Sequence, residues 1–321
     1  MNYIKTISII VLSIISTLLH SQDTAITDLQ DTVISNERSE SFFLPEKIKD
    51  SWELGFHTGH FLVDGDVDKR LPSGYGIGLH LRKAIHYTFS LRADVMFGES
   101  YGLDPQMWAH SSKGGGLVEN VFLPYQNQDG WFPKYRTRYG HFVAQTIFNI
   151  GNLLYLQDKT TWSTYFAVGA GIKTHSTMLD LLDNDGKPYA NLSNFSGDLD
   201  TRSGRNIIKD KIESIYDGNY ETQSWKKVGI YKYNDKFNFM PVFTASLGFS
   251  KKINDRMNLS FEHQVNLSDD DSMDGIRFRT AFDQSNSNDV SHYTNIRLGI
   301  NLGNRENRTE PLYWLNPLNP L

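Results

Sequence analysis

The stretch YTFSLRADVMF, at positions 87–97, alternates large apolar side chains with polar ones. A β-strand directs successive side chains to opposite faces, so this stretch as a strand has one apolar face and one polar, charged face. It is about ten residues long, the length that a tilted strand needs to cross a lipid bilayer. The apolar positions are Tyr87, Phe89, Leu91, Ala93, Val95 and Phe97, and Thr88, Ser90, Arg92, Asp94 and Met96 lie between them.

Further segments along the chain show the same alternation, which predicts eight strands in all. Two residues fit the pattern poorly. Pro241 lacks the N–H that a strand ladder needs, and His263 falls on an apolar face. The last segment shows a phase slip near Asn295, with Tyr293 on its apolar face. The other seven segments are residues 52–62, 75–81, 142–150, 162–172, 237–249, 257–267 and 293–302.

The links between the predicted strands alternate in length. Short links at 83–85, 157–159 and 254–255 follow the second, fourth and sixth strands, and long links follow the third, fifth and seventh. Short turns on one side and long loops on the other are typical of bacterial outer-membrane barrels. The sequence therefore predicts an all-β fold, an eight-stranded antiparallel transmembrane β-barrel with long extracellular loops. A soluble sandwich, with the apolar faces as its core, is the alternative.

The N-terminus has the features of a secretory signal peptide. Lys5 precedes a mainly apolar run at 7–19, and Ser21 offers a small residue at a cleavage point. We therefore expect a signal peptide at 1–21 and a location in the cell outer membrane. A periplasmic N-terminal segment at 22–50, the outer-membrane β-barrel at 51–303 and a periplasmic C-terminal tail at 304–321 are expected to follow.

The composition excludes several classes of site. The chain has no cysteine, which removes disulfides, thiolate metal ligands and a lipidated cysteine behind the signal. The formal net charge of −5 becomes about −6 after cleavage, because residues 1–21 carry one lysine and no acid. Without a basic patch, nucleic acid is not an expected partner, whereas outer-membrane lipid is.

Several short segments carry a resemblance to a known family. They are FPKYRTRY at 132–139, DGNYET at 217–222, DDD at 269–271 with DG at 274–275, HYTNIRL at 292–298 and EPLYWLNPL at 310–318. With them, residues 50–321 resemble the N-terminal barrel of OmpA-family outer-membrane proteins of the Bacteroidetes type. The resemblance implies the barrel and no catalytic motif. Members of that family usually continue beyond the barrel into a peptidoglycan-binding domain. Because cell-wall tethering belongs to that domain, it is not carried over to these barrel residues.

Charged residues are predicted to line the interior of the barrel. An eight-stranded barrel is just wide enough inside for side chains, and buried charges must pair. We expect Arg92 and Arg297 to contact Glu53, Asp94 or Glu262 and so form a plug of ion pairs. A gate that rearranges to open a pore is the alternative. The full set on the polar faces is Glu53, His80, Arg82, Arg92, Asp94, Glu262 and Arg297.

Two acidic loops are candidate calcium sites, because calcium takes several carboxylate oxygens. The first holds Asp269, Asp270, Asp271 and Asp274, and the second holds Asp180, Asp183 and Asp185 around Gly186. Neither loop has the glutamate that an EF-hand requires at its twelfth position. Solvated turns are the alternative, since aspartate and glycine favour turns for backbone reasons. No other cofactor is expected.

A short amphipathic helix is predicted in the longest loop, where apolar residues from Ile207 to Tyr216 recur at helical spacing before Gly218. Its apolar face needs a partner, which is either its own loop or another outer-membrane or periplasmic protein. The candidate partner surface consists of Ile208, Ile212 and Ile215, with Tyr313 and Trp314 of the tail.

The function expected from these features is structural: an OmpA-type barrel with a role in envelope integrity, or a subunit of a larger outer-membrane complex. A narrow pore for small solutes is the first alternative, and a lipid-modifying or proteolytic barrel is the second. Catalysis would need a serine, a histidine and an acid within hydrogen-bond reach. The candidates near strand ends are His57, His60, His141, His175 and Ser176.

Overall fold

The computed structural model describes residues 52–108, 120–125, 130–153, 162–190, 192, 198–224, 229–232, 238–254, 256–276, 288–302 and 312–314. All of them belong to the unit formed by residues 47–321. The signal peptide, the segment at 22–50 and most of the predicted tail lie outside the described residues. Within these ranges, none of the helices has both the length and the apolar character needed to cross a membrane.

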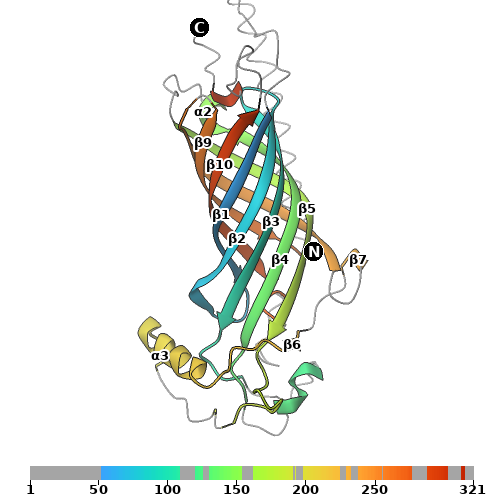
Figure 1. The fold of residues 1–321 in the computed structure, drawn as a ribbon, viewed down its shortest axis with the longest axis vertical. Helices are drawn as coiled ribbons and strands as arrows, with labels where there is room; N and C mark the ends of the chain where they lie inside the picture. The colour runs from blue at the N-terminus through green and yellow to red at the C-terminus, as the bar shows by residue number, and fades with distance from the viewer. Residues whose placement is uncertain are drawn as a thin grey trace, which may run out of the picture. The chain divides into compact units, whose positions relative to one another are not determined.

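Eight long antiparallel strands close into a barrel (Figure 1). Each strand pairs with its neighbour in sequence, and closure comes from the pairing of β1 with β10. Two further short strands and helix α3 lie in the long link between β5 and β8, and β5 itself pairs directly with β8. The barrel strands are β1 (Trp52–Asp64), β2 (Lys69–Ala84), β3 (Phe89–Leu103), β4 (Lys134–Asn149), β5 (Trp162–Leu179), β8 (Asn238–Lys252), β9 (Met257–Leu267) and β10 (Val290–Leu302).

The two ends of the barrel differ. At the short-turn end, β2 runs into β3 and β8 into β9 through tight turns, and α2 (Ile150–Leu153) and η4 (Leu312–Trp314) lie there too (Figure 1). At the loop end lie η2 (Asn120–Tyr125), α3 (Arg202–Glu213) and β6 (Thr222–Gln223). The remaining short strand is β7 (Tyr231–Lys232), which pairs with the start of β8. The long links expected after β3, β5 and β9 are therefore confirmed, whereas the modest loop expected after the first strand has only four residues, 65–68.

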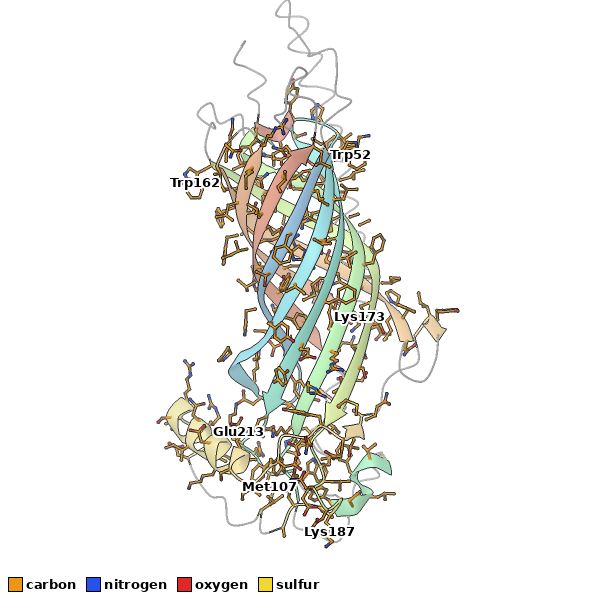
Figure 2. The ribbon with its side chains drawn as sticks, in the orientation of Figure 1. Trp52, Met107, Trp162, Lys173, Lys187 and Glu213 are labelled. Carbon is orange, nitrogen blue, oxygen red and sulfur yellow. The ribbon has the colours of Figure 1, made fainter. Side chains whose placement is uncertain are left out.

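The outward face of the barrel carries a band of exposed apolar side chains. On β2, for example, every second residue from Tyr75 to Leu81 is exposed and apolar, and Leu79 is 57% exposed. Trp52 and Trp162 mark the band at the short-turn end (Figure 2). Lys83 lies over the ring of Trp52, and Lys251 lies over the ring of Trp162. Other members of the band are Leu54, Phe56, Ile77, Leu91, Phe97, Phe142, Phe166, Phe243, Leu247, Phe249, Leu259, Phe261, Ile296 and Ile300.

The expected phase slip in the last strand is wrong. β10 pairs with β1 and with β9 in continuous register, so Tyr293 faces the lumen and is fully buried. Its hydroxyl lies 3.0 Å from Nδ1 of His57. The ring packs over Gly76, where a Cβ would lie only 2.7 Å from it. A polar partner at the tip and a glycine under the ring allow this large residue to point inward.

Pro241 is accommodated in β8 without a bulge. It pairs with Ile172 of β5 in continuous register. The pairing of β8 with β9 extends only as far as Phe243, so Pro241 lies beyond the point where β8 has neighbours on both sides. A missing N–H is tolerated at such an edge position. His263 faces outward as expected, and its Nδ1 lies 2.8 Å from the Thr294 hydroxyl.

The loops at the loop end share a second apolar core. Trp108 and Trp131 of the β3–β4 link form a two-residue bridge, and Phe122 stacks on Trp131 with ring centroids 4.8 Å apart. Tyr189 stacks on Tyr216 at 4.1 Å within the β5–β8 link. Buried members also come from the β1–β2 and β9–β10 links. We call this cluster the loop core: Val67, Leu103, Trp108, Phe122, Tyr125, Trp131, Phe132, Tyr135, Leu179, Leu181, Tyr189, Leu192, Ile208, Ile212, Tyr216 and Ile276.

Candidate functional site

The middle of the lumen is filled by a network of buried ion pairs. Arg92 makes a bidentate contact with Glu262, with distances of 2.7 and 3.0 Å. Arg297 lies 2.6 Å from a carboxylate oxygen of Asp94 and 2.9 Å from one of Glu262. β3, β9 and β10 supply these four residues, which are all buried. Because each carboxylate has a guanidinium partner, the charges can stay in this narrow, water-poor space.

Glu53 contacts other residues than the two arginines. It accepts a hydrogen bond from Nε2 of His80 at 3.1 Å and from Nδ2 of Asn258 at 2.8 Å. The Tyr313 hydroxyl also donates to it. The strand phase shows that Glu53 faces the lumen but does not show which residue comes closest. We call Glu53, Arg92, Asp94, Glu262 and Arg297 the lumen network.

The tail residues Tyr313 and Trp314 close the short-turn end. Both are buried. The guanidinium of Arg82 lies 3.6 Å from the centre of the Tyr313 ring, and the Tyr313 carbonyl accepts a hydrogen bond from Asn149 at 3.1 Å. Arginine on the face of an aromatic ring gains electrostatic attraction, more so when the pair is desolvated. These two members of the candidate partner surface therefore pack against their own barrel.

A layer of apolar side chains lies next to the lumen network on the side of the loop end. Phe61 and Tyr139 are packed with ring centroids 4.9 Å apart, and Met96 and Tyr293 are fully buried beside them. The loop core follows beyond this layer. The lumen is thus filled at successive levels by the tail, the lumen network, the apolar layer and the loops.

Helix α3 is tied to the barrel by its buried face. Ile208 and Ile212 belong to the loop core. Nζ of Lys209 donates to Asp68 at 2.9 Å and to the Lys69 carbonyl at 2.7 Å, both of which adjoin the β1–β2 link. Ile215 is 40% exposed. This placement favours packing on its own loops as the role of the helix, with Ile215 as the accessible part of the predicted surface.

The contribution of α3 to the loop core can be measured with one substitution. We expect Ile212→Ala to destabilise the packed helix by about 2–5 kcal/mol, because it leaves a cavity at a fully buried position. Limited proteolysis of α3 should then be at least about tenfold faster, since cleavage follows the population of the opened loop. Ile207→Ala, on the exposed face of the same helix, is the matched control. Equal cleavage rates in the two variants would contradict this packing.

The predicted calcium ligands differ in their surroundings. Asp270 lies 2.8 Å from Nζ of Lys173 and 3.3 Å from Nδ1 of His175. Burial alone would raise the pKa of Asp270, but the charges of His175 and Lys173 lower it to about 2. Asp269 is exposed and Asp271 half-buried, whereas Asp274 is fully buried.

Asp274 instead lies near Asp289, which directly precedes β10. Burial is the main cause that raises the pKa of Asp274 to about 7, and the charge of Asp66 adds to it. Burial, followed by the charge of Asp274, raises the pKa of Asp289 well above its ordinary value. No sequence pattern pointed to Asp289, because it is separated from the acidic loop by more than a dozen residues.

The second acidic loop has the contacts of a turn. Asp180 is held by Nζ of Lys134 at 2.7 Å and by the Tyr189 hydroxyl at 2.8 Å. Asp183 accepts backbone hydrogen bonds from Asp185 at 3.0 Å and from Lys187 at 2.8 Å. Gly186 between them has a φ of 74°, a conformation that glycine adopts at little cost. These contacts favour the turn interpretation.

Among the described residues, one trio has the spacing of a metal site: His57, His80 and Asp94 in the lumen. Arg297 already supplies positive charge there. Its Nη1 lies 2.6 Å from Asp94 and 3.5 Å from Nδ1 of His80. The guanidinium thus contacts two of the three residues, Asp94 and His80, and we assign the trio to the surroundings of the lumen network.

A serine, a histidine and an aspartate do come within hydrogen-bond reach. Nε2 of His175 lies 3.3 Å from the Ser272 hydroxyl, and its Nδ1 lies 3.3 Å from Asp270. However, the Ser272 hydroxyl donates to Asp270 at 2.6 Å, and all three residues are buried. A nucleophilic serine needs its proton directed at the histidine and an open face for substrate. The geometry favours an ion-pair network around Lys173 over an active site.

The other candidate catalytic residues are dispersed. His57 and His141 each lie 3.3 Å from Asp94 in the lumen. His60 accepts a hydrogen bond from the Ser73 backbone at 3.1 Å. Ser176 faces outward near the end of β5. The arrangement brings His57 and His141 together with an acid but not with a serine nucleophile.

Comparison with known proteins gives similarities of fold. No family model matches the chain, and no curated protein matches it. The neisserial surface protein NspA is a similar solved structure, with 10% identity and a TM-score of 0.33, covering 78% of this chain and 96% of that one. The attachment invasion locus protein Ail of Yersinia pestis has 9% identity and a TM-score of 0.34, covering 78% and 97%. The fold assignment, a closed eight-stranded antiparallel barrel with a filled lumen, rests on the strand pairing described above.

Proposed function

We propose that this chain is a structural barrel of the bacterial outer membrane, of the OmpA type, which stabilises the envelope and does not conduct solutes. The observation that carries the proposal is the combination of an apolar outward band with a lumen filled by buried ion pairs. A water-soluble protein rarely exposes so large an apolar surface, whereas a lipid-facing barrel requires one. A conducting pore would need water in place of the lumen network.

The two ends of the apolar band support an orientation in which the loop end faces the cell exterior. Trp52 and Trp162 with their neighbouring lysines have the chemistry of a membrane interface, where an amphipathic ring meets the headgroups. Beyond the opposite edge of the band, Arg136 and Arg138 of β4 face outward, and Arg138 pairs with Glu99 at 2.7 Å. The loop end then faces the cell exterior, in accordance with the usual position of long loops in such barrels.

Solute permeability separates the structural role from the pore alternative. Proteoliposomes with the folded barrel should retain small solutes as well as empty liposomes do, because the lumen is filled at several levels. The Arg92→Ala/Arg297→Ala double variant tests whether the lumen network is the main barrier to solutes. If proteoliposomes with this variant leak, the barrier lies in the lumen network. Rapid solute passage through the unchanged protein, at an equal folded fraction, would favour the narrow pore and contradict the proposal.

A place in a larger outer-membrane complex is the second part of the proposal. Two accessible apolar residues, Ile207 on α3 and Ile215 just after its C-terminus, support it. Gentle detergent extraction from native outer membranes, followed by mass spectrometry, should recover a partner in constant ratio to the barrel. Substitution of Ile215 by aspartate should then release it, with Glu213→Gln, at the last residue of α3, as the control. A barrel that is extracted alone would contradict this part and leave the structural role to the barrel itself.

A further inference from the structure

Two buried carboxylates converge at the loop end of the barrel, directly beneath the β1–β2 link. Asp274 belongs to the β9–β10 link and Asp289 precedes β10, and the two are 0% and 1% exposed. The backbone of Gly65 runs over them. A Cβ at Gly65 would lie 2.1 Å from Oδ1 of Asp289 and 2.6 Å from Oδ2 of Asp274. Both oxygens therefore lie on the same side of Gly65, close to each other, and any side chain at position 65 would overlap them.

Both carboxylates are held in place by backbone donors. Oδ2 of Asp274 accepts from the Val67 N–H at 2.9 Å, and its Oδ1 accepts from the Ile276 N–H at 3.0 Å. Oδ2 of Asp289 accepts from the Met273 N–H at 2.6 Å. Oδ1 of Asp289, in contrast, is buried and has no hydrogen-bond partner among the described residues. A buried acceptor in this state is costly unless something else occupies the space in front of it.

The charges around Asp274 and Asp289 differ from those around neighbouring aspartates. Three other aspartates of this end have a cation: Asp270 has Lys173 at 2.8 Å, Asp68 has Lys209 at 2.9 Å and Asp64 has Lys69 at 2.6 Å. In the part of the chain that the structure describes, no lysine, arginine or histidine pairs with Asp274 or Asp289. Asp66 brings a further negative charge close to Asp274. Two carboxylates buried side by side repel each other and disfavour the ionised pair unless a positive charge is added.

We propose that a hard divalent cation, calcium in the first place, binds between Oδ2 of Asp274 and Oδ1 of Asp289 at Gly65. Carboxylate oxygens are the ligands that calcium prefers, and water would complete its coordination. With few protein ligands, the affinity falls in the weak range of extracellular calcium modules, about 10⁻⁴–10⁻³ M. The ion would hold two distant parts of the β9–β10 link together, next to Gly65 of the β1–β2 link. This site differs from the one that the acidic run at 269–271 suggests, because Asp270 is already occupied by Lys173 and Asp269 is exposed.

Calorimetry of the full chain, folded in a zwitterionic detergent free of lipopolysaccharide and stripped with EDTA, tests the proposal. Titration with calcium chloride should show about one ion bound per chain. Asp289→Asn and Asp274→Asn should each weaken binding by about tenfold or more, since each removes a charged ligand of a hard ion. Asp269→Asn, in the same loop but exposed, is the matched control and should bind as the unchanged protein does. Gly65→Ala should also lose binding, although it keeps both carboxylates, because its methyl group would overlap the two ligand oxygens and displace them.

The result for the unchanged protein does not depend on how well the variants fold. If it shows no binding heat and no rise of its unfolding temperature in 10 mM calcium (roughly ten times the expected dissociation constant), the proposal is wrong. The same conclusion follows if Asp289→Asn binds calcium as tightly as the unchanged protein. Loss of binding in Asp269→Asn with retention in Asp289→Asn would move the site to the acidic run and would also overturn it.

Discussion

Replacement of Arg297 by methionine is expected to lower the free energy of unfolding by about 3–5 kcal/mol, because it leaves buried carboxylates without their cation. Arg297 is buried and contacts both Asp94 and Glu262. Methionine roughly keeps the length and apolar volume of the side chain, so the loss reports mainly on the charge. Denaturant unfolding of the barrel in lipid vesicles, followed by tryptophan fluorescence, measures the change.

The matched control is Arg138→Met. Arg138 pairs with Glu99 at 2.7 Å, but its side chain is 66% exposed. An exposed ion pair contributes about 0–1 kcal/mol, so this variant should lose little. Arg297→Lys, which keeps a positive charge but not the fork of donors, should fall between the two. If Arg297→Met loses no more stability than Arg138→Met, the lumen network is not the structural plug that we describe.

The second large effect is expected on the outward face, where Leu79→Arg should cost about 2–4 kcal/mol in a lipid bilayer. Leu79 lies within the exposed apolar run of β2 and is 57% exposed. In water such a position tolerates arginine, because no buried contact is lost. In a bilayer the charge must leave water, and this transfer is the source of the cost.

Ser176→Arg provides the control for this prediction. Ser176 also faces outward, but it lies near the loop end of β5, past the last exposed apolar residue of that strand, Ile172. Arginine near the interface costs about 0–1 kcal/mol. The two variants should therefore differ when unfolded from lipid vesicles. Equal stabilities would place the apolar band outside the membrane and contradict the proposed location.

For the lumen network, the alternation along each strand predicts which residues face inward but not which of them are in contact. Alternation along β3 places Arg92 and Asp94 on the inward face, and the same reasoning places Glu262 and Arg297 there. It does not tell which of them meet. Arg92 and Glu262 are separated by 170 positions, and their contact depends on the tilt of the strands and on their stagger around the barrel.

The strands also extend further than their sequence pattern does. β4 begins at Lys134, although the alternation starts at Phe142. Past the edge of the band, outward positions such as Arg136 and Arg138 are polar, while inward positions there include apolar residues of the loop core such as Tyr135. The apolar-out pattern is lost where the outer face no longer contacts an apolar medium, so sequence periodicity finds only the band.

Sequence alone determined the number of strands, their direction and which face of each is apolar, because side chains alternate with a period of two in any strand. It also placed the charges of the lumen network on the inward faces, but it did not single out Lys173 of β5, which is buried as well. The tertiary structure decided what those charges contact, that Tyr293 faces the lumen, that the long loops share one apolar core and that Asp289 joins Asp274 beneath Gly65. These features depend on residues far apart in the chain, which are brought together only when the sheet closes and the loops pack over its end.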